Sequence, residues 1–341
     1  MSSIYTKQMV VVVLLLLLRT MDIEASRRIR NPFLQTVYEH HTNPIWDRQR
    51  LTQQFPVEKW YSCDIQQFPE HLQHLFIQCC LDNQTEVFLD KSYEKSDWFF
   101  TQMWHSLAKV FLGFVMSTTS VNGLLGRGSM FVFSTNQFRT LLGISETWKA
   151  DHLLDLGAGD GAVTQQIAAH FRQITTTEMS PTMQWRLGQK GYRVVNINEW
   201  AGPTCRYDVI SCLNLIDRCD QPISILHDIH RSLSPGGMAI ISLVLPFKPF
   251  VESGALQNKP SEQLNIEGRS WEHQAASFIN NVLLPAGFTL QSFTRLPYLC
   301  EGDMSRPFYS LDDAVFIVKA DSTGIEHQGW CNARTQDSID L

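Results

Sequence analysis

The nine residues from Leu153 to Gly161 constrain the fold of this chain more than any other stretch. They read Leu-Leu-Asp-Leu-Gly-Ala-Gly-Asp-Gly, an apolar run followed at once by a turn of small residues. The next segment, 162–170, has the pattern of a helix. A strand, a glycine turn and a helix start together form a nucleotide-binding hairpin. Glycine lets the backbone approach a ligand, and a helix N-terminus offers it unpaired N–H groups.

The spacing within the turn separates two classes of cofactor. A dinucleotide fingerprint reads G-x-G-x-x-G. Here the glycines stand at Gly157, Gly159 and Gly161, with Asp155 before them and Asp160 between them. Two carboxylates would repel a pyrophosphate, whereas S-adenosylmethionine has no phosphate and carries an ammonium and a sulfonium group. The motif favours this methyl donor, and the alternative is a tight glycine turn in some other α/β sheet.

Further polar residues follow the ends of later apolar runs. Glu178 ends the next run, where a carboxylate can hold a ribose diol, and Asn198 and Asn214 follow the third and fourth runs. Ligands of parallel sheets bind beyond the carboxyl ends of the strands, near the switch in strand order. We therefore expect Asp155 and these three residues to be neighbours. Asp217 would lie on the same side of a helical turn as Asn214, with helix capping as the alternative for both residues.

From residue 150 onward the segments alternate between strand and helix, which predicts a parallel sheet with right-handed crossovers. A late hairpin joins the last two strands. This order matches the α/β class I seven-stranded Rossmann-like methyltransferase sheet, over residues 150–320. The seven strands are expected at 152–156, 174–178, 192–197, 207–213, 238–245, 287–296 and 313–319.

The N-terminal segment 1–25 is signal-like and hydrophobic. Residues 9–18 form an uninterrupted run of apolar side chains between Lys7 and Arg19. As a helix they would span about 15 Å, half of a bilayer core of about 30 Å, which favours a signal peptide over a membrane span. We expect entry into the endoplasmic reticulum and the secretory pathway, with Asn83 in a glycosylation sequon. Retained membrane association and mitochondrial targeting are the alternatives.

The rest of the chain divides by composition. Residues 26–60 are predicted to be a polar linker, and 61–149 an N-terminal helical layer with a glycine-rich lid. In that lid, the loop 123–129 holds three glycines and Arg127, so it either covers a cofactor carboxylate or is a plain turn. The polar tail 321–341 is expected to be disordered.

Charge and cysteine content exclude two further classes of site. The net charge is −6 with no long basic run, and nucleic-acid binding needs clustered Lys and Arg. We therefore expect no nucleic-acid partner. The eight cysteines include no C-x-x-C and two adjacent members, so neither a disulfide framework nor a metal site is expected.

Four segments of the chain resemble the DREV family of methyltransferases, the family of methyltransferase-like protein nine. The similarity covers roughly residues 60 to 319, and the first sixty residues depart from it. The glycine motif is shared by many methyltransferases, while the other three segments are specific to the family. The four segments are 153–161, 120–134, 207–222 and 294–304.

This resemblance implies a protein-histidine methyltransferase, and we separately expect the chain to be a monomer. It would use S-adenosylmethionine to methylate the pros nitrogen, Nδ1, of the second histidine in His-x-His segments with a small middle residue. In the family pattern Glu178, Asn214 and Tyr298 would contact the cofactor, and Asn214 with Asp217 would face the target imidazole.

The chemistry of imidazole suits these residues. Neutral imidazole is already a nucleophile, with an ordinary pKa of about 6.5, so the site has to select a nitrogen rather than supply a strong base. If Asp217 accepts the Nε2–H, the lone pair on Nδ1 is left free to attack. Two alternatives stay open: a methyltransferase acting on a small molecule, lysine or nucleic acid, and a catalytically silent binding module.

Overall fold

The structure, a computed structural model, describes residues 57–97, 121, 125, 126, 128–202, 204–251, 258–302 and 306–321. The chain divides into two compact units, Met1–Val57 and Glu58–Leu341, and the described residues belong almost entirely to the second. The predicted signal segment, nearly all of the predicted linker, Arg127 and the tail from residue 322 lie outside the described residues.

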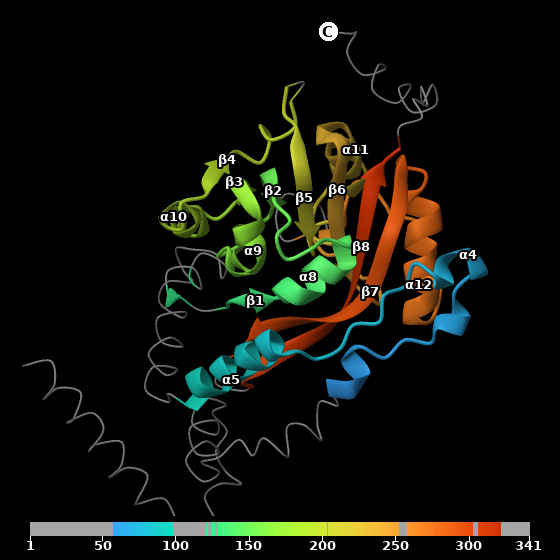
Figure 1. The fold of residues 1–341 in the computed structure, drawn as a ribbon, viewed down its shortest axis with the longest axis horizontal. Coiled ribbons are helices and arrows are strands. Elements are labelled where there is room, and N and C mark those ends of the chain that lie inside the picture. Colours follow the sequence, from blue (N-terminus) through green and yellow to red (C-terminus); the bar gives the residue numbers. More distant parts are fainter. Residues whose placement is uncertain are drawn as a thin grey trace, which may run out of the picture. The chain divides into compact units, whose positions relative to one another are not determined.

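An eight-stranded sheet forms the centre of this unit, in the order β1-β7-β8-β6-β5-β2-β3-β4 (Figure 1). Strands β2 to β6 are parallel, while β7, β8 and β1 add antiparallel pairings. The predicted α/β methyltransferase sheet is confirmed. The strands are β1 (Met130–Phe131), β2 (Ala150–Leu156), β3 (Phe171–Thr177), β4 (Arg193–Val195), β5 (Tyr207–Leu213), β6 (Leu233–Val244), β7 (Phe288–Glu301) and β8 (Phe308–Ala320).

The number of strands differs from the seven that the sequence predicts, because β1 is an eighth strand at the edge. Strand β7 continues to Glu301, five residues beyond the predicted end at Leu296. The extension offers backbone groups to β1, whose Met130 and Phe131 pair with Cys300 and Leu299. A segment of two residues carries too little periodicity to be found in the sequence.

The direction of the chain reverses between β2 and β5. From β2 the chain proceeds outward through β3 and β4, and then returns to place β5 on the other side of β2. Loops that follow β2 and β5 therefore leave the sheet in opposite directions, which opens the crevice where ligands of parallel sheets bind. Gly157, Glu178 and Asn214 directly follow β2, β3 and β5 at this edge.

Local sequence explains where the helices begin. Ser134, Ser180 and Ser270 each accept a backbone N–H as N-caps, and Ser134 forms a capping box with Gln137. The helices are α4 (Glu70–Gln73), α5 (Asn83–Asp97), α8 (Thr135–Leu142), α9 (Ala162–Ile167), α10 (Pro181–Gln189), α11 (Pro222–Ser232) and α12 (Trp271–Phe278), the last continued by a π-helical turn (Ile279–Leu283).

Helix α11 ends at Ser232, because Leu233 is already extended and pairs with Tyr207. In the predicted helical layer, Asn83 of the sequon is exposed at the start of α5, whereas Thr85 is buried and donates its hydroxyl to Asp82.

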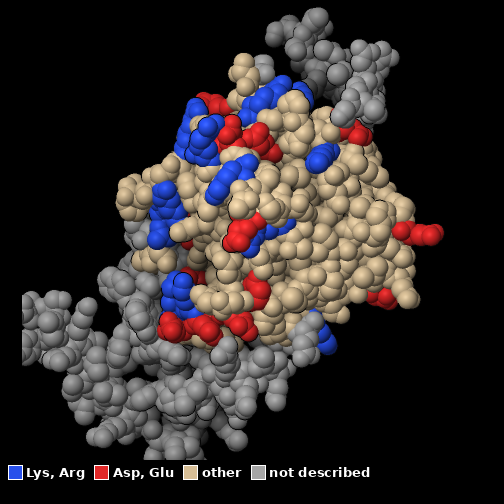
Figure 2. All heavy atoms as spheres, viewed as in Figure 1, with Lys and Arg blue, Asp and Glu red and all other residues tan. Residues whose placement is uncertain are grey.

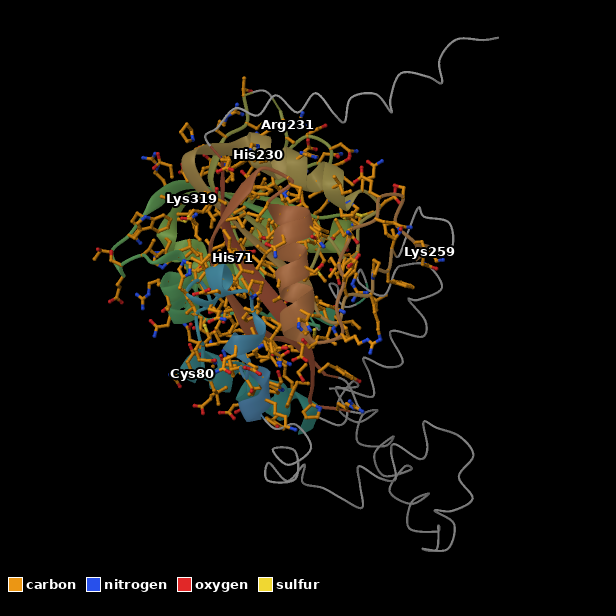
Figure 3. The ribbon with its side chains drawn as sticks, turned by 90° about the vertical axis from the view of Figure 1, so that its right-hand side faces the viewer. His71, Cys80, His230, Arg231, Lys259 and Lys319 are labelled. Atoms are coloured by element: carbon orange, nitrogen blue, oxygen red, sulfur yellow. The ribbon has the colours of Figure 1, made fainter. Side chains whose placement is uncertain are left out.

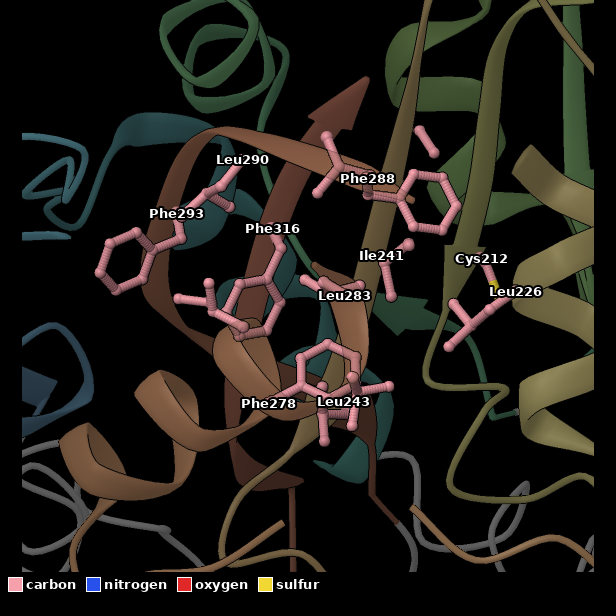
Figure 4. Close-up of a cluster of buried hydrophobic side chains, with 14 of the residues drawn as sticks. Cys212, Leu226, Ile241, Leu243, Phe278, Leu283, Phe288, Leu290, Phe293 and Phe316 are labelled. Atoms are coloured by element: carbon pink, nitrogen blue, oxygen red, sulfur yellow. The ribbon is translucent and has the colours of Figure 1, made fainter. Parts of the chain in front are cut away.

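Aromatic and aliphatic side chains on the face of the sheet that packs against α11 and α12 make the largest part of the core (Figure 4). Phe278 of α12 lies against Phe316 of β8, with ring centroids 5.1 Å apart. Cys212 of β5 is fully buried beside Leu226 of α11, and it serves as a small hydrophobe, as its position in an apolar strand predicts. Burial of one such aromatic side chain contributes about 1.5–3 kcal/mol to the stability of the fold. The core therefore stabilises the strands whose ends carry the site residues.

The surface of the unit mixes charges of both signs. Lys and Arg are interspersed with Asp and Glu on the face shown in Figure 2, and much of that face is uncharged. Within the described ranges, no helix is both long enough and apolar enough to cross a membrane.

Candidate active site

The glycine turn after β2 has one open side and one packed side. Gly157, Gly159 and Gly161 all have positive φ, at 70°, 56° and 72°. A Cβ on Gly161 would stand 2.8 Å from Leu187, and one on Gly157 would stand 3.2 Å from Leu215, whereas one on Gly159 would have no atom within 4 Å. Gly159 is therefore the position where the backbone can be approached by a ligand.

Side chains of the protein already occupy N–H groups of this turn. The N–H of Gly159 donates to Glu178 Oε2 at 3.0 Å, and the N–H of Ala162 donates to Asp160 Oδ1 at 3.0 Å. The expectation that the start of the helix offers unpaired N–H groups is wrong for Ala162, the first residue of α9. The turn can receive a ligand through its open glycine side.

Glu178 ties the turn to the next helix. Its Oε1 accepts the backbone N–H groups of Met179 at 2.8 Å and Ser180 at 2.9 Å, and Oε2 accepts that of Gly159. A carboxylate has about four acceptor positions, so three backbone donors leave room for one more. Glu178 lies at the predicted place, and its contact with a ribose stays a prediction.

Asp155 lies one residue before the end of β2 and is buried. Its Oδ1 accepts the hydroxyl of Ser211 at 2.6 Å, and its Oδ2 accepts the hydroxyl of Thr164 at 2.5 Å. Burial raises the pKa of Asp155 to about 6, and the charge of Glu178 also raises it. These bonds join β2 to β5 and α9. Both carboxylate oxygens of Asp155 therefore already have hydrogen-bond partners within the protein.

The structure does not bring Asn198 to the other predicted residues by any contact. It is exposed beyond the end of β4, where its N–H donates to Asn196 Oδ1 at 3.0 Å. The predicted contact of Asn198 with the cofactor stays a prediction.

Asn214 is the first residue after β5 and has an uncommon backbone conformation. Its φ is 52°, in the left-handed region that costs most non-glycine residues about 1–2 kcal/mol and that Asn tolerates best. The backbone N–H donates to the carbonyl of Ser242 at 3.1 Å, and the side-chain Nδ2 donates to Asp313 Oδ2 at 3.0 Å. Its Oδ1 is buried and has no hydrogen-bond partner.

Two buried carboxylates accompany Asn214. Asp217 Oδ2 lies 3.3 Å from the Nε of Arg218, and Asp217 Oδ1 has no partner; Asp313 of β8 is fully buried, and its Oδ1 has no partner either. We call Asn214, Asp217 and Asp313 the acceptor cluster. Three buried oxygens without a hydrogen-bond partner in one place are unusual, because each such atom costs about 1–3 kcal/mol.

The two carboxylates titrate differently. Burial, together with the charge of Asp217, raises the pKa of Asp313 to about 8, although the hydrogen bond from the Asn214 amide lowers it. Burial also raises the pKa of Asp217, but the Arg218 guanidinium beside it opposes the shift. Asp217 is therefore the carboxylate that ionises first, and Asp313 holds its proton to higher pH.

Tyr298 joins the edge strand to the acceptor cluster. In the hairpin of β7 and β8, Tyr298 is opposite Leu311 and Leu296 is opposite Asp313, so Tyr298 and Asp313 project from the same face. The hydroxyl of Tyr298 donates to Met130 Sδ of β1. Burial and neighbouring acidic groups raise the pKa of Tyr298 well above its ordinary value, so the phenol keeps its proton.

Asp313 is the member of the cluster that reasoning from sequence missed. The sequence marks it only as the first residue of the last predicted strand. One signal was available: Asp312 and Asp313 are adjacent, and neighbouring strand residues face opposite sides of a sheet. Asp312 pairs with Arg295 at 2.9 Å and is half-exposed, which leaves Asp313 on the other side of the sheet.

The structure contains no arrangement suited to a metal ion in the parts of the chain that it describes. No group of three or more His, Cys, Asp or Glu residues there could hold one. Figure 3 labels His71, Cys80 and His230, which lie on separate elements. The cysteines within the described ranges are all free.

Comparison with known proteins gives a family match over most of the chain and partial matches to individual proteins. A family model described as DREV methyltransferase matches residues 60–320. A ubiquinone biosynthesis O-methyltransferase of Azotobacter vinelandii is 28% identical over 101 residues, which are 27% of this chain and 44% of that protein. One from Coxiella burnetii is 25% identical over 107 residues, 29% of this chain and 45% of that protein. The chain thus spans less than half the length of these curated relatives.

Solved structures show weaker likeness. The glycopeptide N-methyltransferase MtfA complexed with sinefungin is 16% identical, with a TM-score of 0.36 and coverage of 55% of this chain and 85% of that chain. The N-methyltransferase NodS from Bradyrhizobium japonicum, in complex with S-adenosyl-l-homocysteine, is 14% identical, with a TM-score of 0.35 and coverage of 55% and 84%.

Proposed function

Because this chain belongs to the DREV methyltransferase family, we propose that it transfers a methyl group to Nδ1, the pros nitrogen, of the second histidine in His-x-His segments of proteins. Its cofactor is S-adenosylmethionine. The observation that supports this target best is the acceptor cluster, in which Asn214, Asp217 and Asp313 each keep a buried oxygen without a donor.

The residues at the carboxyl edge of the sheet fit this cofactor. Gly159 leaves its side of the turn open, and Glu178 has an acceptor position left for a ribose hydroxyl. Asn214 and Tyr298 would contact the end of the cofactor that carries its positive charges. When bound, S-adenosylmethionine supplies a methyl group attached to a positively charged sulfur.

An imidazole matches what the acceptor cluster lacks. The neutral ring has one N–H donor and, on the other nitrogen, one lone pair. If Asp217 accepts the Nε2–H, the ring is held in the tautomer whose Nδ1 is free to attack the methyl group. The same carboxylate stabilises the positive charge that the ring gains, as the aspartate of a catalytic triad does for its histidine. Positioning of the ring supplies much of the remaining acceleration.

Other acceptors of a methyl group fit this cluster less well. A lysine amine has an ordinary pKa of about 10.4 and must lose a proton from the attacking nitrogen itself. The matched ubiquinone biosynthesis proteins are named O-methyltransferases, which makes a small-molecule hydroxyl the second candidate. A hydroxyl also attacks through the atom that carries the proton, whereas in imidazole the donor and the nucleophile are different atoms.

A peptide panel with labelled S-adenosylmethionine tests the proposal. We expect label in a peptide with His-x-His and a small middle residue, on the second histidine by fragmentation mass spectrometry. We expect little label when the second histidine is alanine, or when the middle residue is large. Label in lysine peptides or in small phenols, with none in any histidine peptide, would contradict the proposal and favour the alternatives.

A further inference from the structure

Asp313 has a contact that determines how Asn214 presents its side chain. The Asn214 amide has a donor end, Nδ2, and an acceptor end, Oδ1, at opposite sides of one planar group. Nδ2 donates to Asp313 Oδ2 at 3.0 Å, so Oδ1 is the end that is left without a partner. Asp313 is fully buried on β8, which lies between β6 and β7.

We propose that Asp313 is a positioning residue of the methyl-transfer site: it fixes the orientation of the Asn214 amide, so that Asn214 and Asp217 present oxygen acceptors together. This inference rests on the proposed function, because the acceptors are read as the holders of an imidazole N–H. An amide rotated by half a turn would present Nδ2 in place of Oδ1. That donor cannot accept the ring N–H, so the orientation that presents Nδ1 would be held less firmly. A flipped ring, with its Nδ1–H on Asp217 and the lone pair of Nε2 toward the methyl group, would then compete.

The surrounding contacts support this reading. The backbone of Asn214 is anchored separately, by its N–H to Ser242, so loss of Asp313 need not displace the residue. Only the rotation of its side chain depends on Asp313 among the described contacts. Tyr298, on the same face as Asp313, uses its hydroxyl toward Met130.

The test substitutes the two adjacent aspartates in the full-length protein. Asp313→Asn keeps the size of the side chain but can meet Asn214 in either amide orientation. Asp312→Asn is the matched control, since Asp312 lies on the opposite face and pairs with Arg295. Each variant is assayed with a His-x-His peptide and labelled S-adenosylmethionine, with calorimetry of S-adenosylhomocysteine binding and thermal unfolding alongside.

We expect Asp313→Asn to lower kcat by about 10-fold to 10²-fold, the scale of a misplaced reactant. We also expect it to yield the tele isomer, methylated on Nε2, in a share that the wild type does not give. Its affinity for S-adenosylhomocysteine should stay within about threefold of wild type, and Asp312→Asn should match the wild type throughout.

Two results would overturn the positioning role while the wild type still methylates the peptide. One is a wild-type rate and isomer ratio in Asp313→Asn. The other is a lower rate in Asp313→Asn with pros-methylhistidine as the only product, accompanied by a lower thermal stability or a weaker affinity for S-adenosylhomocysteine. That combination would indicate a structural role for Asp313. A wild type that methylates no histidine peptide overturns the proposed function itself, and this inference with it.

Discussion

The two ends of the site differ in how their acidic groups are satisfied. Beside the glycine turn, both oxygens of Asp155 and of Glu178 accept hydrogen bonds from the protein. In the acceptor cluster, Asn214, Asp217 and Asp313 each retain a buried oxygen without a donor. The carboxylates at the first end join the turn to its neighbouring elements, whereas those at the second end are the ones that we propose to hold the methylated group.

This difference has an energetic meaning. A buried polar atom without a hydrogen-bond partner lowers the stability of the fold by about 1–3 kcal/mol. Such atoms call for an explanation, and a role in function is one. Substitutions beside the glycine turn should therefore lower stability and cofactor affinity, while substitutions in the acceptor cluster should lower methyl transfer and spare the fold.

The largest effect is expected for Asp217→Asn. The amide keeps the size of the carboxylate but loses the charge that holds the Nε2–H and the developing imidazolium. We expect methyl transfer to a His-x-His peptide to fall by about 10²-fold or more, the scale of one electrostatic contact in a transition state. Initial rates with labelled S-adenosylmethionine measure this, and folding and S-adenosylhomocysteine binding should survive. A rate near that of wild type would remove Asp217 from the transfer site.

Glu178→Ala should act mainly on cofactor binding. It removes the acceptor for three backbone N–H groups together with the proposed contact to the ribose. Hydrogen bonds to charged groups contribute about 1.5–3 kcal/mol, so the affinity for S-adenosylhomocysteine should fall by about 10-fold or more in calorimetry. Glu178→Gln is the matched variant and should lose less, because its carbonyl oxygen still accepts. Wild-type affinity in the alanine variant would show that Glu178 does not contact the cofactor.

The buried acid of the cluster predicts a pH dependence of stability. The pKa of Asp313 rises from 3.8 to about 8 on folding, so the folded protein binds more protons than the unfolded chain within that window. The contribution of Asp313 to the free energy of unfolding therefore decreases as pH rises through it.

Asp313→Asn lacks this contribution, so its free energy of unfolding relative to wild type should rise between pH 5 and 8. We expect a change of about 1.4 kcal/mol or more, the equivalent of one pKa unit. Urea denaturation at several pH values measures it, with Asp312→Asn as the control that follows the wild type. A difference independent of pH would mean that Asp313 is ionised throughout.

The smallest effect is expected for a pair of glycine variants. Gly159→Ala and Gly161→Ala both place a side chain at positive φ, which costs about 1 kcal/mol. Only Gly161→Ala also meets Leu187, at 2.8 Å, so it should be the less stable of the two in denaturant titrations. Gly159→Ala should instead weaken binding of S-adenosylhomocysteine, because its methyl group enters the open side of the turn. Equal binding losses in both variants would argue against that side as the ligand position.

The sequence predicts well what depends on local pattern. The carboxyl ends of β2, β3 and β5, the glycine turn and the places of Glu178 and Asn214 follow from apolar runs and the residues that end them. The partners of those residues depend on contacts between distant segments. The hydrogen bond between Asn214 and Asp313 joins residues 99 positions apart, and it requires the register of the antiparallel strand β8. Local periodicity carries no information about that register.

The identity of the methylated nitrogen tests the central claim most directly. If the acceptor cluster holds the Nε2–H, the wild-type enzyme must place the methyl group on Nδ1 of the second histidine. None of the eleven histidines of this chain lies in a His-x-His segment, so self-methylation should not contribute to the product. Hydrolysis of the peptide and comparison with authentic isomers should give pros-methylhistidine alone. A product that is mainly tele-methylhistidine would contradict the role given to Asp217 and the cluster, whatever the rate.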